Sequence, residues 1–199
     1  MKVSVIRATT GPMHAISEGA GMCYGKDDYN PKRVERCLMN GHTSVTEHVS
    51  ATFRIEGISR SCLAQLTRHR MASFSVMSQR YCKIEGDDWY VTPPSVVEAG
   101  EEVAFEAAIE HSRREYERAI AKGVRKEDAR FLLPEATKTS LVMTINMRSL
   151  QNFLSLRLDK AAQWEIRELA GLMEYELANE SDEWAELLGL MREVRDAQR

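Results

Sequence analysis

The chain has 199 residues, a net charge of −3 and 43% hydrophobic residues, which is enough for one domain with a core of its own. Its mean hydropathy of −0.40 and pI of about 6.0 argue against a membrane span and against a protein that wraps nucleic acid. The first residues lack the apolar core of a signal peptide, and the four cysteines form no C-x-x-C pair, which indicates reduced thiols. We expect a cytoplasmic protein with a single domain over residues 1–199 and with no nucleic-acid or membrane partner.

The first half of the chain is predicted to contain short strands and helices. A strand at Lys2–Arg7 precedes a helix at Pro31–Met39, which ends at Asn40-Gly41. In the next strand, apolar side chains alternate with polar ones, as expected when one face is buried; they are Val49, Ala51, Phe53 and Ile55. A helix follows from Ser59 to about Thr67, the hydroxyl-rich stretch from Ser73 to Ser78 is expected to be irregular, and Pro93-Pro94 blocks regular structure.

The second half is predicted to be mainly helical. A long helix at Glu101–Lys122 has an apolar side made of Val103, Ala107, Ala108, Tyr116 and Ile120. The elements that follow are a helix at Lys126–Leu133, a strand at Leu141–Ile145, helices at Arg148–Leu158 and Ala161–Asn179, and an amphipathic stretch at Glu183–Arg195. This order predicts an α+β fold with more helix than strand.

Two short patterns resemble ligand motifs without meeting their requirements. Gly19-Ala20-Gly21 lacks the third glycine of a dinucleotide-binding turn, and the stretch from Gly21 to Lys26 lacks the spacing and hydroxyl of a P-loop. His42, Glu47 and His48 match no zinc-ligand spacing, so a polar turn is favoured over a metal site. We expect no metal.

The strongest local signal is basic. Residues 65–70 read Gln-Leu-Thr-Arg-His-Arg, and Ser78-Gln79-Arg80 follows after seven residues. Consecutive side chains diverge by about 100° on a helix, so Arg68, His69 and Arg70 can converge only where a helix end unwinds into a loop. Converged guanidinium groups bind phosphate in a bidentate manner, with serine hydroxyls as additional donors. The alternative is a solvated, basic helix end.

A second signal lies in the helix predicted after Asn146. Leu150, Phe153, Leu154 and Arg157 stand at i, i+3, i+4 and i+7, so Arg157 is placed on the apolar side. A buried guanidinium requires a partner, which is either Asp159 or a polar ligand in a dry pocket. Arg148 and Asn152 form a separate polar face suited to an amide-rich ring.

Arg130 adds a third basic position on the short helix before Pro134. Its i, i+3 spacing from Glu127 permits a surface salt bridge.

These segments together resemble the flavin-dependent thymidylate synthases. The pattern Arg68-His69-Arg70, seven residues, then Ser78-x-Arg80 is similar to the signature of that family. Similarity extends over about residues 33–170 and is carried by Gly41-His42-Thr43-Ser44, Glu47-His48, Arg130 before Pro134, residues 146–157, and Ala162-Gln163-Trp164-Glu165-Ile166. The resemblance implies a methyl-transferring enzyme that makes dTMP from dUMP, with the carbon from 5,10-methylenetetrahydrofolate and the hydride from NADPH through FAD.

The resemblance also implies roles for individual residues. Those expected around FAD are His42, Ser44, Glu47, Arg68, His69, Arg70, Val76, Asn146, Met147, Arg148 and Asn152. Those expected to hold dUMP are Gln65, Leu66, Thr67, Arg68, Val76, Met77, Ser78, Gln79, Arg80, Arg130 and Arg157. The catalytic residue is expected to be Arg157, because a guanidinium at the pyrimidine carbonyl edge would stabilise the N3-deprotonated ring and make C5 more nucleophilic.

The family resemblance further implies an α+β domain with a mainly antiparallel sheet, assembled as a homotetramer. The segment from Val76 to Arg80 would reach the nucleotide from one subunit, and Arg157 from another. Val76 stands where many relatives carry an acidic residue, and Ala161 where some carry histidine.

Two other functions fit parts of the pattern. A phosphate- or RNA-binding module would use the arginines without catalysis, but the acidic net charge and the scarcity of nearby aromatics weigh against it. A thymidylate synthase with a thiol nucleophile would need Cys82, the cysteine beside Arg80.

Overall fold

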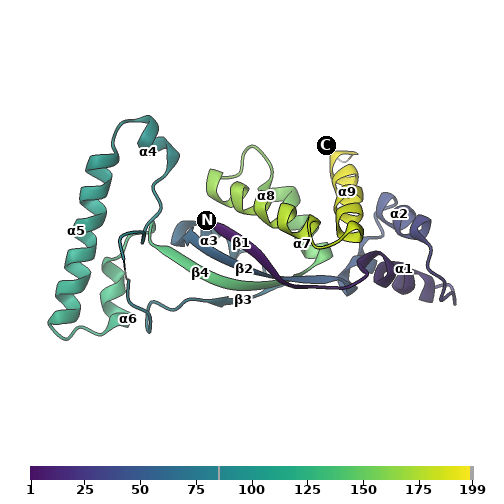
Figure 1. The fold of residues 1–199 in the computed structure, drawn as a ribbon, viewed down its shortest axis with the longest axis horizontal. Coiled ribbons are helices and arrows are strands. Elements are labelled where there is room, and N and C mark those ends of the chain that lie inside the picture. The colour runs from purple at the N-terminus through teal and green to yellow at the C-terminus, as the bar shows by residue number, and fades with distance from the viewer. Residues whose placement is uncertain (85, 198–199) are drawn as a thin grey trace.

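In the computed structural model, which describes residues 1–84 and 86–197, four antiparallel strands form one sheet in the order β1-β2-β4-β3. The strands are β1 (Lys2–Ala8), β2 (Ser50–Ser59), β3 (Ala72–Val76) and β4 (Lys138–Asn146). Helices α7 (Met147–Arg157) and α8 (Trp164–Ala178) cover one face of the sheet, and α9 (Asp182–Ala197) packs on α8 (Figure 1). This arrangement confirms the predicted α+β fold and its antiparallel sheet.

The remaining helices lie at the two ends of the sheet (Figure 1). At one end are α1 (Pro12–Met22), α2 (Pro31–Met39) and the 3-10 helix η1 (Thr43–His48). Beyond the other end, an arm is formed by α4 (Pro94–Glu98), α5 (Glu102–Ala121), α6 (Lys126–Ala129) and the 3-10 turn η2 (Arg130–Leu132). The short helix α3 (Arg60–Leu66) follows directly from β2.

The core lies between the sheet and the helices that cover it. Phe53 of β2 pairs with Met143 of β4, and both side chains are fully buried. Val49, Ala51, Phe53 and Ile55 are all buried, which confirms the strand face predicted from their alternation. Phe153 of α7 and Leu169 of α8 complete this layer. None of the helices described has the length and hydropathy of a membrane span.

The stretch from Ser73 to Ser78 was expected to be irregular, and that prediction is wrong for most of it. Residues 72–76 form β3, an edge strand that pairs with β4. Ala72, Phe74 and Val76 are partly buried, whereas Ser73 and Ser75 are exposed. The serines therefore occupy the solvent side of a strand, and the alternation of apolar and polar residues in Ala-Ser-Phe-Ser-Val is the period-two pattern of a strand with one exposed face.

Three further differences concern helices. Helix α1 was not predicted, although Pro12 stands at its first position and Met13, Ile16 and Ala20 follow at helical spacing. Pro93-Pro94 was expected to block regular structure, yet α4 begins at Pro94, where a missing N–H costs nothing. The apolar side predicted for α5 is largely exposed, because Val103, Ala107 and Ala108 face solvent while Ile109 and Tyr116 are buried.

Gly21 has a packing role instead of a nucleotide-binding one. A Cβ atom at this position would lie 2.5 Å from Nη1 of Arg33 and 2.6 Å from the carbonyl oxygen of Lys26. The Arg33 guanidinium occupies this space because it bonds the carbonyls of Ser17 and Asp28 and pairs with the Asp28 carboxylate at 2.7 Å. The second glycine of Gly19-Ala20-Gly21 therefore serves the packing of α1 against α2.

Candidate active site

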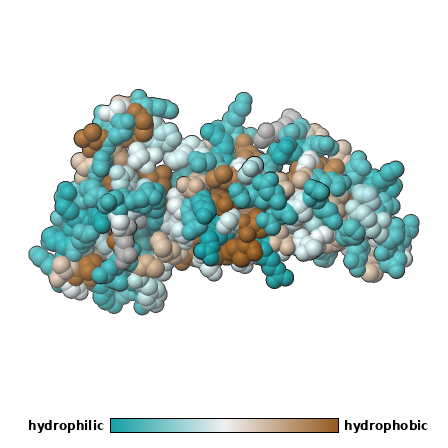
Figure 2. Space-filling model, viewed as in Figure 1, coloured by the Kyte–Doolittle hydropathy of each residue, from teal (hydrophilic) through white to brown (hydrophobic). Residues whose placement is uncertain are grey.

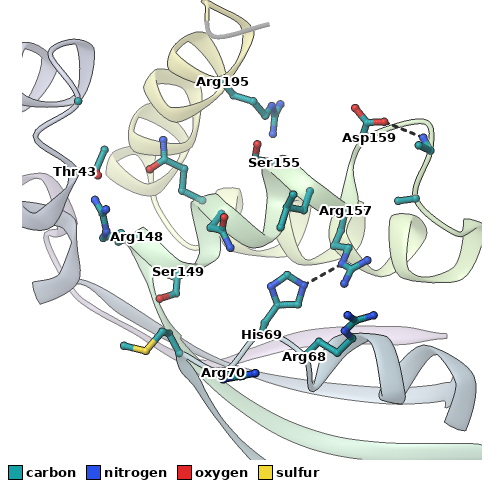
Figure 3. A pocket seen from close by; sticks show the side chains of 17 residues that line it. Thr43, Arg68, His69, Arg70, Arg148, Ser149, Ser155, Arg157, Asp159 and Arg195 are labelled. Carbon is teal, nitrogen blue, oxygen red and sulfur yellow. Dashed lines mark hydrogen bonds between the residues drawn. The ribbon is translucent and has the colours of Figure 1, made fainter.

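A cavity of about 1110 Å³ lies along the solvent side of α7. We call it the α7 cavity. Its walls come from the loop after α3, from α7 itself, from the turn before α8, from the start of η1 and from α9 (Figure 3). Six of the predicted site residues line it: Arg68, His69, Arg70, Arg148, Asn152 and Arg157.

The end of α3 brings the three basic residues to one place. Helix α3 ends at Leu66, and the hydroxyl of Thr67 donates to the carbonyl of Leu63 at 3.0 Å. The chain then turns, with the N–H of His69 donating to the carbonyl of Leu66 at 3.1 Å. As expected for an unwinding helix end, Arg68, His69 and Arg70 all reach the α7 cavity.

The start of α7 is fixed by Asn146. Its side-chain oxygen accepts a hydrogen bond from the N–H of Ser149 at 2.9 Å, which caps the helix. In the first turn of α7, Arg148 pairs with Glu47 of η1 at 3.4 Å, and both side chains are about half exposed. This pair ties η1 to α7 at one end of the cavity.

Arg157 and His69 point toward each other across the cavity (Figure 3). Nε of Arg157 donates to Nε2 of His69 at 3.0 Å, and Nη2 donates to the carbonyl of Gln65 at 3.4 Å. The imidazole meets the ring of Phe153 edge to face, with centroids 4.9 Å apart. A histidine that accepts this bond is neutral, and burial, followed by the charge of Arg157, lowers its pKa below the ordinary 6.5.

Asp159, the partner considered from sequence, lines the same cavity and accepts a hydrogen bond from the N–H of Ala161 at 2.9 Å. The bonds from Arg157 to His69 and Gln65 hold the guanidinium in a fixed orientation. A guanidinium has five N–H donors, so Arg157 can also bind a ligand.

The other predicted nucleotide-binding arginines lie elsewhere, where β3 leads to the arm. Nε of Arg80 pairs with the Glu127 carboxylate at 2.8 Å, and Arg125 pairs with the other oxygen of that carboxylate at 2.9 Å. Arg130 donates to the backbone carbonyl of Glu127 at 3.0 Å. The expected side-chain bridge between Arg130 and Glu127 is thus replaced, because Arg80 and Arg125 take the carboxylate.

Not every predicted residue is part of the cavity wall. Within the described chain, the wall does not include His42, Ser44, Glu47, Gln65, Leu66, Thr67, Val76, Met77, Ser78, Gln79, Arg80, Arg130, Asn146 or Met147. Leu66 and Met147 are buried in the core, so only their backbone can reach a ligand. Likewise, within residues 1–84 and 86–197 no three His, Cys, Asp or Glu side chains are grouped to hold a metal ion.

Sequence reasoning missed several residues of the wall. Gln151 and Ser155 lie on the same face of α7 as Arg148, at i+3 and i+7, so helical spacing alone could have found them. Arg195 reaches the cavity from α9 (Figure 3). It is about 40 residues beyond α7, and no local pattern signals this contact.

Five arginines line the α7 cavity, together with amide side chains and a neutral histidine. Such a lining in an α+β fold is suited to a large, anionic ligand with polar rings, as in enzymes that bind nucleotides.

Comparisons with known proteins identify the family. A family model described as "Thymidylate synthase complementing protein" matches residues 4–181. A flavin-dependent thymidylate synthase of Geobacter sulfurreducens is 40% identical over 183 residues, which cover 85% of this chain and 79% of that protein. One of Pyrococcus horikoshii is 39% identical over 207 aligned residues, covering 94% and 85%.

A solved structure agrees with these relatives. Thymidylate synthase X of Helicobacter pylori, crystallised with FAD and dUMP, superposes with a TM-score of 0.75 at 26% identity, covering 94% of this chain and 97% of that one. The chain belongs to the flavin-dependent thymidylate synthase family. The family and activity expected from sequence are thereby confirmed, and a binding module without catalysis is not favoured.

Proposed function

We propose that the α7 cavity holds FAD and that the chain converts dUMP to dTMP, with 5,10-methylenetetrahydrofolate as carbon donor and NADPH as reductant. The observation that carries this proposal is the convergence of Arg68, His69 and Arg70 with Arg148 and Arg157 in one cavity. The Helicobacter pylori enzyme with the same fold was crystallised with FAD and dUMP, which supports the choice of ligands.

The lining of the cavity fits this cofactor. Its volume of about 1110 Å³ lies at the upper end of ligand pockets, as a dinucleotide requires. Arg68, Arg70 and Arg148 would meet the pyrophosphate, and the amides of Gln151 and Asn152 would bond the edge of the isoalloxazine ring. The chemistry that FAD would supply here, when bound and reduced, is the hydride needed to complete the methyl group.

Arg157 would activate the pyrimidine. The protein orients its guanidinium through His69 and the Gln65 carbonyl, so the remaining donors need no reorganisation when dUMP binds. Placed at a carbonyl of uracil, they stabilise the negative charge left when N3 loses its proton, and C5 becomes a better nucleophile. In this mechanism no nucleophilic side chain is needed, and the exposed thiol of Cys82 has no part in it.

The separation of the arginines supports an active site shared between subunits. Arg80 and Arg130 gather at Glu127 on the arm, whereas Arg157 lies in the α7 cavity. Large apolar side chains are exposed on the same arm, with Phe131 at 85% and Val103 at 82%. Figure 2 shows brown side chains interrupting the polar surface there. A second subunit would cover them and bring the Arg80 group of one chain to the Arg157 of another.

The test is an assay for dTMP with purified protein, dUMP, methylenetetrahydrofolate and NADPH, with and without FAD. We expect a flavin absorbance spectrum after reconstitution and product only when FAD is present. The Cys82→Ala variant should keep this activity. Flavin binding without product would favour a binding module, and product without FAD would contradict the proposal.

A further inference from the structure

A buried carboxylate lies at the start of α8, outside the α7 cavity. Glu165 is 2% exposed, and Ser59 satisfies both of its oxygens. Oε1 accepts the N–H of Ser59 at 2.7 Å, and Oε2 accepts its hydroxyl at 2.5 Å. A buried carboxylate is costly unless it is hydrogen-bonded in this way. The two residues therefore form a specific hydrogen-bonded contact between α8 and the end of β2.

This contact fixes the N-terminus of α3. Ser59 is the N-cap of this helix, and its hydroxyl oxygen accepts the N–H of Cys62 at 2.9 Å. Gln163 fixes Glu165 from the other side, because its side-chain oxygen accepts the N–H groups of Glu165 and Ile166 at 2.9 and 3.2 Å. Cys62 stays a neutral thiol here, since burial, with Glu165 adding to it, raises its pKa.

The chain segment between α7 and α8, residues 157–165, also holds the C-terminal end of α3. Arg157, the last residue of α7, donates to the carbonyl of Gln65 and to His69. Residues 157 and 165 are eight positions apart, and α3 has only seven residues. Residues 157–165 thus bracket α3, with Glu165 at its start and Arg157 at its end.

We propose that Glu165 is a positioning residue: by fixing the start of α3 through Ser59, it places the Gln65 carbonyl and His69 where they orient the Arg157 guanidinium. Its effect on turnover rests on the proposed function. Its effect on the contact between His69 and Arg157 does not, and is observable in protein without flavin or substrate.

The first readout is the pKa of His69, measured by NMR titration of the flavin-free protein. In the wild type it lies below 6.5, because the imidazole is buried beside Arg157. We expect Glu165→Ala to raise it toward 6.5 as α3 moves. Glu165→Gln should restore the wild-type value, since its amide can still accept the N–H of Ser59 and donate to the hydroxyl. Ser59→Ala, a milder change that keeps one bond, should give an intermediate value.

The second readout is steady-state kinetics. We expect Glu165→Ala to lower kcat by about 10²-fold, as a displacement of about 1 Å at a reacting group does, while KM for dUMP changes less. Leu169→Ala is the control for stability, because Leu169 is fully buried on the same helix and is part of the main core. It should lower the melting temperature and leave kcat and the His69 pKa near wild type.

The inference is overturned if Ser59→Ala and every folded Glu165 variant leave the His69 pKa unchanged, or if Leu169→Ala shifts it equally. If the His69 pKa responds as expected but no variant and no wild-type protein makes dTMP, the proposed function fails while the positioning role stands.

Discussion

Replacing Arg157 by alanine removes the guanidinium that reaches from the end of α7 to the loop after α3. Two of its N–H groups are used within the protein, on His69 at 3.0 Å and on the Gln65 carbonyl at 3.4 Å. Of the five donors of a guanidinium, about three remain to meet the pyrimidine. We expect kcat to fall by about 10²- to 10³-fold, or about 2.7–4 kcal/mol, the cost of losing one preorganised donor to developing charge.

The fold should survive this change. Arg157 is only half-buried, so its hydrogen bonds to His69 and Gln65 are partly screened by solvent, and their loss is small beside that of a core side chain. Flavin content and the melting temperature should therefore stay close to wild type. Arg157→Lys keeps the charge but not the fixed fork of donors, so it should recover only part of the turnover.

The assay is kcat at saturating dUMP, with flavin content measured by absorbance on the same samples. Arg167→Ala is the matched control. Arg167 lies on α8, is not part of the described cavity wall, and donates to the carbonyl of Lys160 at 3.0 Å. Its loss should leave kcat near wild type. Arg157→Ala with turnover close to that of Arg167→Ala would refute the activation of dUMP by this guanidinium.

Three further predictions concern pH and stability. Burial and the charge of Arg157 lower the pKa of His69. We expect kcat to be maximal at pH values above that lowered pKa and to decrease as the pH falls through it, because the imidazolium cannot accept the hydrogen bond from Arg157. The free energy of unfolding should also decrease as the pH falls from 6.5 toward that pKa, since the unfolded chain takes up the proton first; unchanged pH profiles in His69→Gln would contradict both effects. Asn146→Ala removes the cap of α7 and should cost about 1 kcal/mol in urea unfolding, with Asn146→Asp close to wild type. Gly21→Ala, whose Cβ would lie 2.5 Å from Nη1 of Arg33, should cost about 1–3 kcal/mol, whereas Gly189→Ala, with nothing within 4 Å, should be neutral or stabilising; equal effects would refute the packing argument.

The elements with a clear hydrophobic period were predictable. The alternation in β2 and the i, i+3, i+4 spacing in α7 both follow from burial on one face. Helix α7 lies within one residue of its predicted bounds, whereas β2 continues to Ser59, beyond the alternating residues Val49 to Ile55. The edge strand β3 was not predicted. Its serines lie on the open side of the sheet, where nothing selects against polar residues, so composition favoured a loop.

The candidate site was predictable in its parts but not in its assembly. The local sequence allowed Arg68, His69 and Arg70 to converge on one ligand, provided that the helix end unwinds into a loop, and the structure has this unwinding. The bond from Arg157 to His69 joins positions 88 residues apart, and no local pattern specifies such a contact. The pattern of α5 predicted an apolar side, but Val103, Ala107 and Ala108 are exposed in the single chain. The proposed second subunit would cover them, and the sequence of one chain does not specify that contact.

We propose that the Arg80 group of one subunit and the Arg157 of another form one nucleotide site, and mixing the two single variants tests this sharing most directly. Arg80→Ala and Arg157→Ala proteins are dissociated, combined in equal amounts and reassembled, and mass measurement verifies the hetero-oligomers. Random association places both wild-type residues in about one quarter of shared sites. We therefore expect the mixture to recover about a quarter of wild-type dTMP formation, although each variant alone keeps only a small residual activity. Hetero-oligomers that remain as inactive as the separate variants would contradict the claim and place both arginines in a site within one chain.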